Sequence, residues 1–225
     1  DPTRLAMTDF ADARRHMVDG QIRPNDVTDL RVLAAMLEVP RERFAPPAST
    51  SIAYLDLDLP MGEGAAASRC LLKPMLLAKL FNAAEIKSTD RVLDVGCVTG
   101  YAAALLARMA EQVVALEQDA GLAKTAKAAL SSLPNVTVVS GPLVEGWPQG
   151  GPYDLIVLEG ATEIEPQAFG RQLKDGGRLV CVLGAGPGAA AMLYRRSGDD
   201  FGGRPVFNAA AAVLPGFVKP PAFAF

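Results

Sequence analysis

Short apolar runs alternate with segments of helical periodicity through the second half of the chain. The apolar runs, each bounded by glycine, proline or polar residues, cover 91–95, 113–117, 135–141, 152–160 and 176–184. Residues 101–110 are strong helix formers, and Asp119 can cap a helix whose apolar positions are Leu122, Ala126, Ala129, Leu130 and Leu133. Nearly continuous apolar strands that alternate with helices are typical of a parallel sheet covered on both faces. The pattern therefore predicts a doubly wound α/β fold.

The end of the predicted sheet differs from its centre because no helix separates the last apolar runs. Residues 192–197 and 206–214 have strand character and follow the run at 176–184 directly. Strands joined by a short connection pair antiparallel, whereas parallel strands need a long crossover. The pattern therefore predicts an antiparallel hairpin at one edge of the sheet.

The first part of the chain predicts a helical addition to this sheet. Thr28 can cap a helix that Pro40 ends and that places on one face Leu30, Leu33, Ala34 and Leu37. A second helical pattern covers 72–86, with Pro74 tolerated in its first turn. Between the two, residues 45–70 lose all periodicity and are rich in proline, glycine and serine. A loop of that length is usually functional or disordered.

Composition and charge narrow the class of protein. Half of the 225 residues are hydrophobic and 21% are charged, which suits one soluble globular domain. The net charge of −3 gives no electrostatic footprint for nucleic acid or an anionic membrane, and no apolar run reaches about 18 residues. Three cysteines without C-x-x-C spacing favour a reducing compartment, and the single histidine, His16, is too little for a catalytic triad or a zinc site. We expect a cytoplasmic protein without a metal, and neither nucleic acid nor membrane as partner.

Two features at predicted strand ends point to a nucleoside-binding site. The segment VLDVGCVTGY (92–101) ends a strand near Asp94 and turns through Gly96 and Gly100 into a helix start, where the backbone can approach a ligand. Glu117 closes the next strand, 21 residues after Gly96, where an acidic residue commonly binds ribose hydroxyls. Each feature alone also fits an ordinary turn or a solvated carboxylate. Their spacing favours a nucleoside-binding half-fold.

These residues leave two cofactors open, S-adenosylmethionine and NAD. The carboxylate before the first glycine favours S-adenosylmethionine. This carboxylate would attract the ammonium and sulfonium of S-adenosylmethionine, whereas it would repel the pyrophosphate of NAD. GAGPGA (184–189) also has dinucleotide-like spacing, but Pro187 and the strand-like run after it leave no helix N-terminus for a phosphate. We interpret that segment as a glycine-rich connection.

Several segments between about Met17 and about Gly184 resemble the protein-L-isoaspartate O-methyltransferase family. They are MVDGQI (17–22), RVLAAMLEVPRERFAP (31–46), AYLDLDLPMGEG (53–64), VLDVGCVTGY (92–101), VVALEQD (113–119), GWP (146–148), PYDLIV (152–157) and RQLKDGGRLV (171–180). VPRERFAP and LPMGEG are specific to this family, whereas the glycine loop is shared by many methyltransferases. The chain is identified as a member.

The resemblance implies a Rossmann-like class I S-adenosylmethionine-dependent methyltransferase fold with a mostly parallel seven-stranded sheet. It also implies methyl transfer from S-adenosylmethionine to the carboxylate of L-isoaspartyl residues in damaged proteins or peptides, which is protein repair and leaves S-adenosylhomocysteine. Residues 7–70 then supply N-terminal helices and the substrate loop, and 71–225 the core of a single domain. By motif position, Ser68 hydrogen-bonds near the reacting carboxylate and Glu117 accepts the ribose. The other implied cofactor contacts are Asp94, Gly96, Cys97, Gly100, Tyr101, Gln118, Pro142 and Leu143.

Departures from the family pattern fall at these contacts. Where the family has Gln-Thr-Ile-Ser-Gln-Pro or a close variant, this chain reads AAASRC (65–70), so only Ser68 remains. Val98 replaces the middle glycine of the cofactor loop, and its β-branched side chain is expected to forbid a positive φ. Pro142 replaces an aspartate that commonly holds the adenine amino group. The threonine and alanines usual after the fourth strand are LEGAT (158–162), and the tail 206–225 lacks the familiar closing strand.

Three functions therefore remain open. A divergent isoaspartate methyltransferase predicts turnover of an isoaspartyl peptide. A methyltransferase repurposed for another acceptor, such as a small-molecule carboxylate, predicts tight cofactor binding without that turnover. A non-catalytic relative, binding a ligand or protein through the same cleft, predicts weak or absent cofactor affinity. We expect His16 to have a surface or packing role, and Cys70 and Cys97 to be packing residues.

Overall fold

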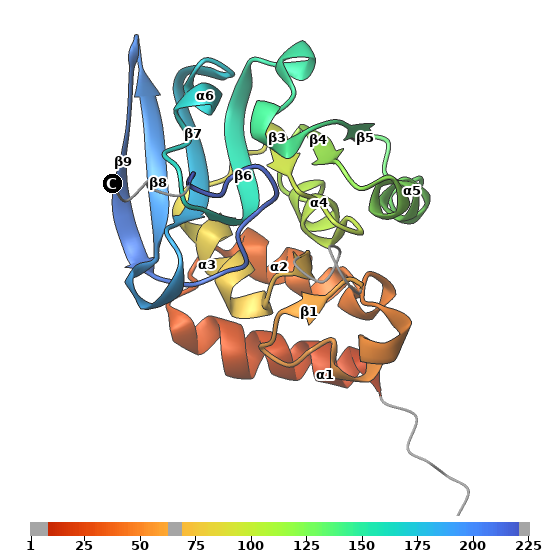
Figure 1. Ribbon diagram of the computed structural model, residues 1–225. Helices are drawn as coiled ribbons and strands as arrows, with labels where there is room; N and C mark the ends of the chain where they lie inside the picture. Colours follow the sequence, from red (N-terminus) through yellow and green to blue (C-terminus); the bar gives the residue numbers. More distant parts are fainter. Residues whose placement is uncertain (1–8, 63–68, 221–225) are drawn as a thin grey trace, which may run out of the picture.

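A seven-stranded sheet of order β5-β4-β3-β6-β7-β8-β9 forms the centre of the computed structural model, which describes residues 9–62 and 69–220 (Figure 1). Its strands are β3 (Arg91–Val95), β4 (Gln112–Glu117), β5 (Val136–Ser140), β6 (Tyr153–Thr162), β7 (Leu173–Leu183), β8 (Ala190–Ser197) and β9 (Asp200–Asn208). Strands β3 to β7 are parallel, and β8 is antiparallel to both β7 and β9. A separate ribbon pairs β1 (Leu59–Pro60) with β2 (Cys70–Leu71). The predicted α/β fold class is confirmed.

Helices gather mainly on one side of this sheet. The α-helices are α1 (Phe10–Met17), α2 (Leu30–Glu38), α3 (Pro74–Ala84), α4 (Tyr101–Leu106), α5 (Ala120–Ala129) and α6 (Gln167–Gly170). Short 3-10 or π turns cover Val18–Ile22, Arg23–Asn25, Arg41–Arg43, Pro47–Ile52, Leu143–Glu145, Pro148–Gly150 and Gly186–Gly188. Figure 1 shows α1 and α2 at one end of the molecule, and α3 contacts both α2 and β7. Within the described residues, no helix is long and apolar enough to cross a membrane.

Two predicted helix starts are confirmed. Pro74 is the first residue of α3, where its missing N–H costs no helical hydrogen bond. Asp119 caps α5, and its carboxylate accepts a hydrogen bond from the Leu122 N–H at 2.8 Å. The helix predicted over 101–110 ends earlier, at Leu106.

The predicted apolar face of α2 is wrong. Leu30 is 72% exposed and Leu37 39%, whereas the buried positions are Val32, Leu33, Ala35 and Met36. The cap is Asp29 rather than Thr28, since the Asp29 carboxylate accepts from the Arg31 N–H at 2.9 Å. Apolar residues occupy both sides of this helix, and its contacts with α3 and the turn at Val18–Ile22 select the buried one.

The predicted edge hairpin is confirmed, but its last strand was placed too late in the chain. β9 pairs with β8 from Asp200 to Asn208, so the closing strand is present and begins before the tail. From residue 209 the chain leaves this edge, and Val213 forms an isolated parallel bridge with Ala161 of β6 (Figure 1, dark blue segment). The tail thus returns across the sheet toward the carboxyl end of β6.

Alternate strand residues point to opposite faces and build two apolar clusters. One face packs against α2 to α5 and includes Val92, Val113, Leu155, Val157 and Val180. The other face includes Leu93, Leu116, Ile156 and Leu158, together with Leu143, Phe169, Leu214 and Phe217 from short or irregular segments. On this second face the C-terminal segment supplies part of the cover that a long helix would otherwise provide.

Candidate active site

Three buried acidic residues lie at the carboxyl edge of the sheet. Asp94 lies near the end of β3, Glu117 is the last residue of β4, and Glu159 lies near the end of β6. β3 and β6 flank the point where the strand order reverses, which is where doubly wound sheets bind ligands. The sequence reasoning predicted Asp94 and Glu117 here and missed Glu159. The signal for Glu159 was the same as for Glu117, an acid directly after an apolar strand.

Glu117 is fully buried and holds five hydrogen bonds. Its Oε1 accepts from Arg69 Nη1 at 2.6 Å and from the N–H groups of Gln118 and Asp119. Its Oε2 accepts from Arg69 Nη2 at 2.8 Å and from the Val98 N–H at 2.9 Å. The carboxylate therefore connects the glycine loop, the end of β4 and the segment after residue 68.

Asp94 and Glu159 form a pair of adjacent buried carboxyl groups. Apart from each other, the two carboxyl groups have no hydrogen-bond partner within the described residues. Burial raises the pKa of Asp94 to about 7, and the charge of Glu117 adds to this effect. Burial, followed by the neighbouring charge of Asp94, raises the pKa of Glu159 well above its usual value. Burial therefore disfavours the charged form of both carboxyl groups, and a cationic group beside them would offset this cost.

The cofactor loop turns through three residues with positive φ, namely Gly96 (+83°), Val98 (+54°) and Gly100 (+99°). The expectation that Val98 forbids a positive φ is wrong. A β-branched residue is strained in this region, and the Val98 N–H is held there by its hydrogen bond to Glu117. The loop therefore keeps its turn although a glycine is missing.

Two predicted cofactor contacts, Gly100 and Tyr101, pack against the core. A Cβ on Gly100 would lie 2.6 Å from Leu130 Cδ1, so this glycine allows α4 to pack closely against the end of α5. The Tyr101 ring is buried against Phe44, with centroids 5.7 Å apart, and beneath the Arg41 guanidinium at 4.9 Å. Both residues support the loop from the core side.

The remaining predicted contacts surround the turn. Cys97 is buried, and its N–H, like that of Gly96, donates to the Leu116 carbonyl. Burial, with the nearby acidic groups, raises the pKa of the Cys97 thiol well above its usual value. Gln118 accepts from the Leu143 N–H at 3.3 Å, and Pro142 precedes that turn without an N–H of its own.

The sequence profile described as Protein-L-isoaspartate(D-aspartate) O-methyltransferase (PCMT) matches residues 12–206. The chain belongs to this family. It is 42% identical over 197 residues to Protein-L-isoaspartate O-methyltransferase 1 of Rhodopseudomonas palustris (strain HaA2), covering 86% of this chain and 79% of that relative. It is 41% identical over 201 residues to Protein-L-isoaspartate O-methyltransferase of Methylorubrum extorquens (strain PA1), covering 88% and 86%.

Solved structures of PCMT proteins share the fold. One protein-L-isoaspartate O-methyltransferase superposes with a TM-score of 0.78 at 25% identity, covering 90% of this chain and 66% of its own. This chain thus spans just under two thirds of that protein. A Plasmodium falciparum structure described as a PCMT in complex with S-adenosyl-L-homocysteine has a TM-score of 0.74 at 16% identity, covering 91% and 97%. The predicted class I methyltransferase fold is confirmed.

The three carboxylates and the glycine turn offer chemical groups suited to a nucleoside cofactor, but other side chains lie in the space beside Gly96. A Cβ on Gly96 would lie 3.1 Å from Arg69 Nη2, 3.3 Å from Leu214 Cδ2 and 3.5 Å from Leu143 Cδ1. Leu214 also covers Gly160, where a Cβ would lie 2.7 Å from its Cγ. The carboxylates suit a nucleoside with a cationic end, and in this structure the guanidinium of Arg69 is paired with Glu117.

The remaining residues considered in the sequence are Ser68, His16 and the cysteines. Ser68 lies outside the described residues. His16 is exposed on α1, as expected. Cys70, Cys97 and Cys181 are free thiols. Within the part of the chain that the structure describes, no group of three or more His, Cys, Asp or Glu residues could hold a metal ion.

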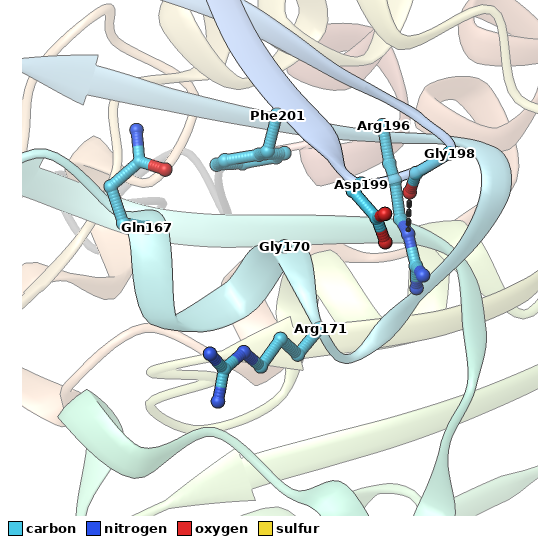
Figure 2. A pocket seen from close by; sticks show the side chains of 7 residues that line it. All are labelled: Gln167, Gly170, Arg171, Arg196, Gly198, Asp199 and Phe201. Carbon is cyan, nitrogen blue, oxygen red and sulfur yellow. Dashed lines mark hydrogen bonds between the residues drawn. The ribbon is translucent and has the colours of Figure 1, made fainter.

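A separate hollow of about 490 Å³ lies at the opposite edge of the sheet (Figure 2). It is lined by α6 and the β8–β9 turn, including Gln167, Arg171, Arg196 and Phe201. The Gly198 N–H donates to Asp175 near the start of β7, which locates the hollow at the amino ends of the parallel strands. The three buried carboxylates therefore lie at the other edge.

Proposed function

We propose that this chain is a protein-L-isoaspartate O-methyltransferase that transfers a methyl group from S-adenosylmethionine to the carboxylate of L-isoaspartyl residues in damaged proteins. The observation that carries the proposal is 42% identity to a relative of that name over 86% of the chain. The buried Glu117 at the end of β4, beside the glycine turn, supports it, because this is where a ribose acceptor is needed.

The reaction requires little acid–base catalysis from the protein. S-adenosylmethionine supplies a methyl group on a positively charged sulfur, which is already electrophilic. A carboxylate with an ordinary pKa near 4 is ionised at neutral pH, so no general base is required. The exposed position of the single histidine, His16, on α1 is compatible with such a mechanism. The protein's main contribution is to align the reacting groups.

Named residues divide that task. Glu117 would hold the ribose hydroxyls, and Asp94 with Glu159 would face the cationic amino-acid end of the cofactor, where opposite charge is favourable. Gly96 would allow the backbone to come close. Ser68 would donate a hydrogen bond that orients one oxygen of the isoaspartyl carboxylate.

A peptide assay tests the proposal. Purified protein should methylate an isoaspartyl peptide and leave the matching aspartyl peptide unmodified. Ser68→Ala should lower kcat by about 10- to 100-fold, since a hydrogen bond to a charged group contributes about 1.5–3 kcal/mol. Ser131→Ala, on an exposed serine just after α5, is the matched control. S-adenosylhomocysteine binding without any turnover of the peptide would contradict this substrate and favour another acceptor.

We also place the protein in the cytoplasm, with isoaspartyl proteins as its partners rather than nucleic acid or membranes. The net charge of −3 and three free cysteines support this placement. Fractionation of native cells, followed by detection of the protein, tests it.

A further inference from the structure

The side chain of Arg69 occupies the site that we propose for the nucleoside. The Arg69 guanidinium makes a two-pronged ion pair with Glu117, with N–O distances of 2.6 and 2.8 Å. The side chains are 4% and 0% exposed. Arg69 Nη2 also lies against the open side of Gly96. Arg69 therefore fills both places that a nucleoside would need, the acceptor and the space beside the glycine.

Glu117 has no capacity left for a ribose in this arrangement. A carboxylate offers about four lone-pair positions, and Glu117 already accepts five hydrogen bonds. Three of these come from backbone N–H groups of the loop and of the residues after β4, and they remain when a side chain moves. Only the two bonds from Arg69 can be exchanged for ribose hydroxyls.

The guanidinium can leave without unfolding the segment that carries it. The Arg69 carbonyl accepts from the Met61 N–H at 2.9 Å, and Cys70 pairs with Pro60 in the β1–β2 ribbon. The backbone at Arg69 is thus fixed independently of its side chain. Within the described residues, Glu117 is the only hydrogen-bond partner of the guanidinium.

We propose that Arg69 is an internal competitor for the ribose acceptor Glu117 and that it sets the affinity of this protein for its nucleoside cofactor. The inference rests on the proposed function. In the free protein the ion pair closes the site, and cofactor binding requires the Arg69 side chain to rotate away from Glu117. The residues of the site are retained, and the affinity of the site for the cofactor is reduced by the free energy of the Arg69–Glu117 ion pair.

Calorimetric titration with S-adenosylhomocysteine tests the proposal without relying on turnover. Arg69→Gln, which introduces the glutamine that the family motif has after its serine, should lower the Kd at least tenfold relative to the wild type. Arg171→Gln, the same charge change at an exposed residue on the opposite edge of the sheet, should leave the Kd unchanged. Adding Glu117→Gln to Arg69→Gln should remove the gain, because the gain acts through Glu117.

A second variant keeps the test valid if Arg69→Gln folds poorly. Arg69→Lys retains the positive charge but loses the two-pronged geometry, so its Kd should fall between those of the wild type and Arg69→Gln. Circular dichroism verifies folding, and S-adenosylhomocysteine should raise the Tm of Arg69→Gln by more than that of the wild type.

The outcomes separate this proposal from the proposed function. Equal, tight binding by the wild type and Arg69→Gln would overturn the competition and leave the methyltransferase function standing. Absence of binding by every folded variant at millimolar ligand would overturn both, and would favour a non-catalytic relative. Tighter binding by Arg69→Gln that persists after Glu117→Gln would also overturn the competition.

Discussion

Two buried arginine–carboxylate pairs lie at opposite edges of the sheet, and their surroundings differ. Arg178 pairs with Asp90 and also donates to the carbonyls of Ala84, Glu85 and Asp154. It therefore joins the end of α3 to β6 and β7. Arg69 pairs with Glu117 alone among the described residues, whereas Glu117 has three backbone N–H donors of its own. Two equally buried ion pairs therefore differ in how many other groups depend on the arginine, which is four for Arg178 and one for Arg69.

The largest expected effect is at the Arg178–Asp90 pair. Arg178→Ala should lower the free energy of unfolding by about 3–5 kcal/mol, because it leaves Asp90 and three carbonyls without their buried donor. Urea denaturation followed by circular dichroism measures the loss. A change below about 1 kcal/mol would show that the two pairs do not differ as described.

Arg69→Gln should lower the free energy of unfolding by less, about 1–2 kcal/mol, because the three N–H donors continue to stabilise the Glu117 carboxylate. The same denaturation experiment, run beside Arg178→Ala, gives the ratio of the two losses directly. A loss equal to that of Arg178→Ala would make Arg69 a structural tie and would weaken the case for exchange.

A dependence on pH, rather than a loss at one pH, is expected at the neighbouring Asp94–Glu159 pair, which has neither a cation nor an N–H donor bonded to it among the described residues. The pKa of Asp94 is raised from 3.8 to about 7, so the folded state retains a proton that the unfolded state loses. Stability should therefore fall as pH rises from about 4 toward 7, and the raised pKa of Glu159 extends the fall to higher pH. Glu159→Gln supplies an amide donor and should reduce that fall, by at most about 1.4 kcal/mol per pH unit.

Denaturation of Glu159→Gln and the wild type at intervals from pH 5 to pH 8 checks the difference in slope. Glu145→Gln, at an exposed carboxylate in the turn after β5, is the control for an added amide. Parallel curves for Glu159→Gln and the wild type would contradict a contribution of this pair to the dependence of stability on pH.

Local patterns predicted the elements better than the contacts between them. Alternation of apolar runs with helices predicted β3 to β7 and the edge hairpin, since burial on both faces leaves a continuous apolar signal. The face of α2 was mispredicted because its apolar residues surround the helix and distant partners select among them. The end of β9 was misplaced because the apolar run continues into the segment that crosses to β6.

The site shows the same limit. Asp94 and Glu117 could be predicted because an acid at a strand end beside a glycine turn is a local signal. Arg69 could not, because its partner lies 48 residues away and the loop around it has no periodicity. Glu159 carried a readable signal that was interpreted only as a departure from the family motif. The roles of Ser68 and of every cofactor contact, Asp94 and Glu117 included, stay predictions.

The sequence of the outer strand β9 affects how other polypeptide chains can pair with this edge of the sheet. Its Pro205 has no N–H to offer, Arg204 beside it carries a charge, and the ladder shifts register near this point. An edge of this kind resists the addition of a foreign strand, which is the first step of aggregation. At the β9 edge, the protein therefore offers a poor template to extended segments of other polypeptide chains.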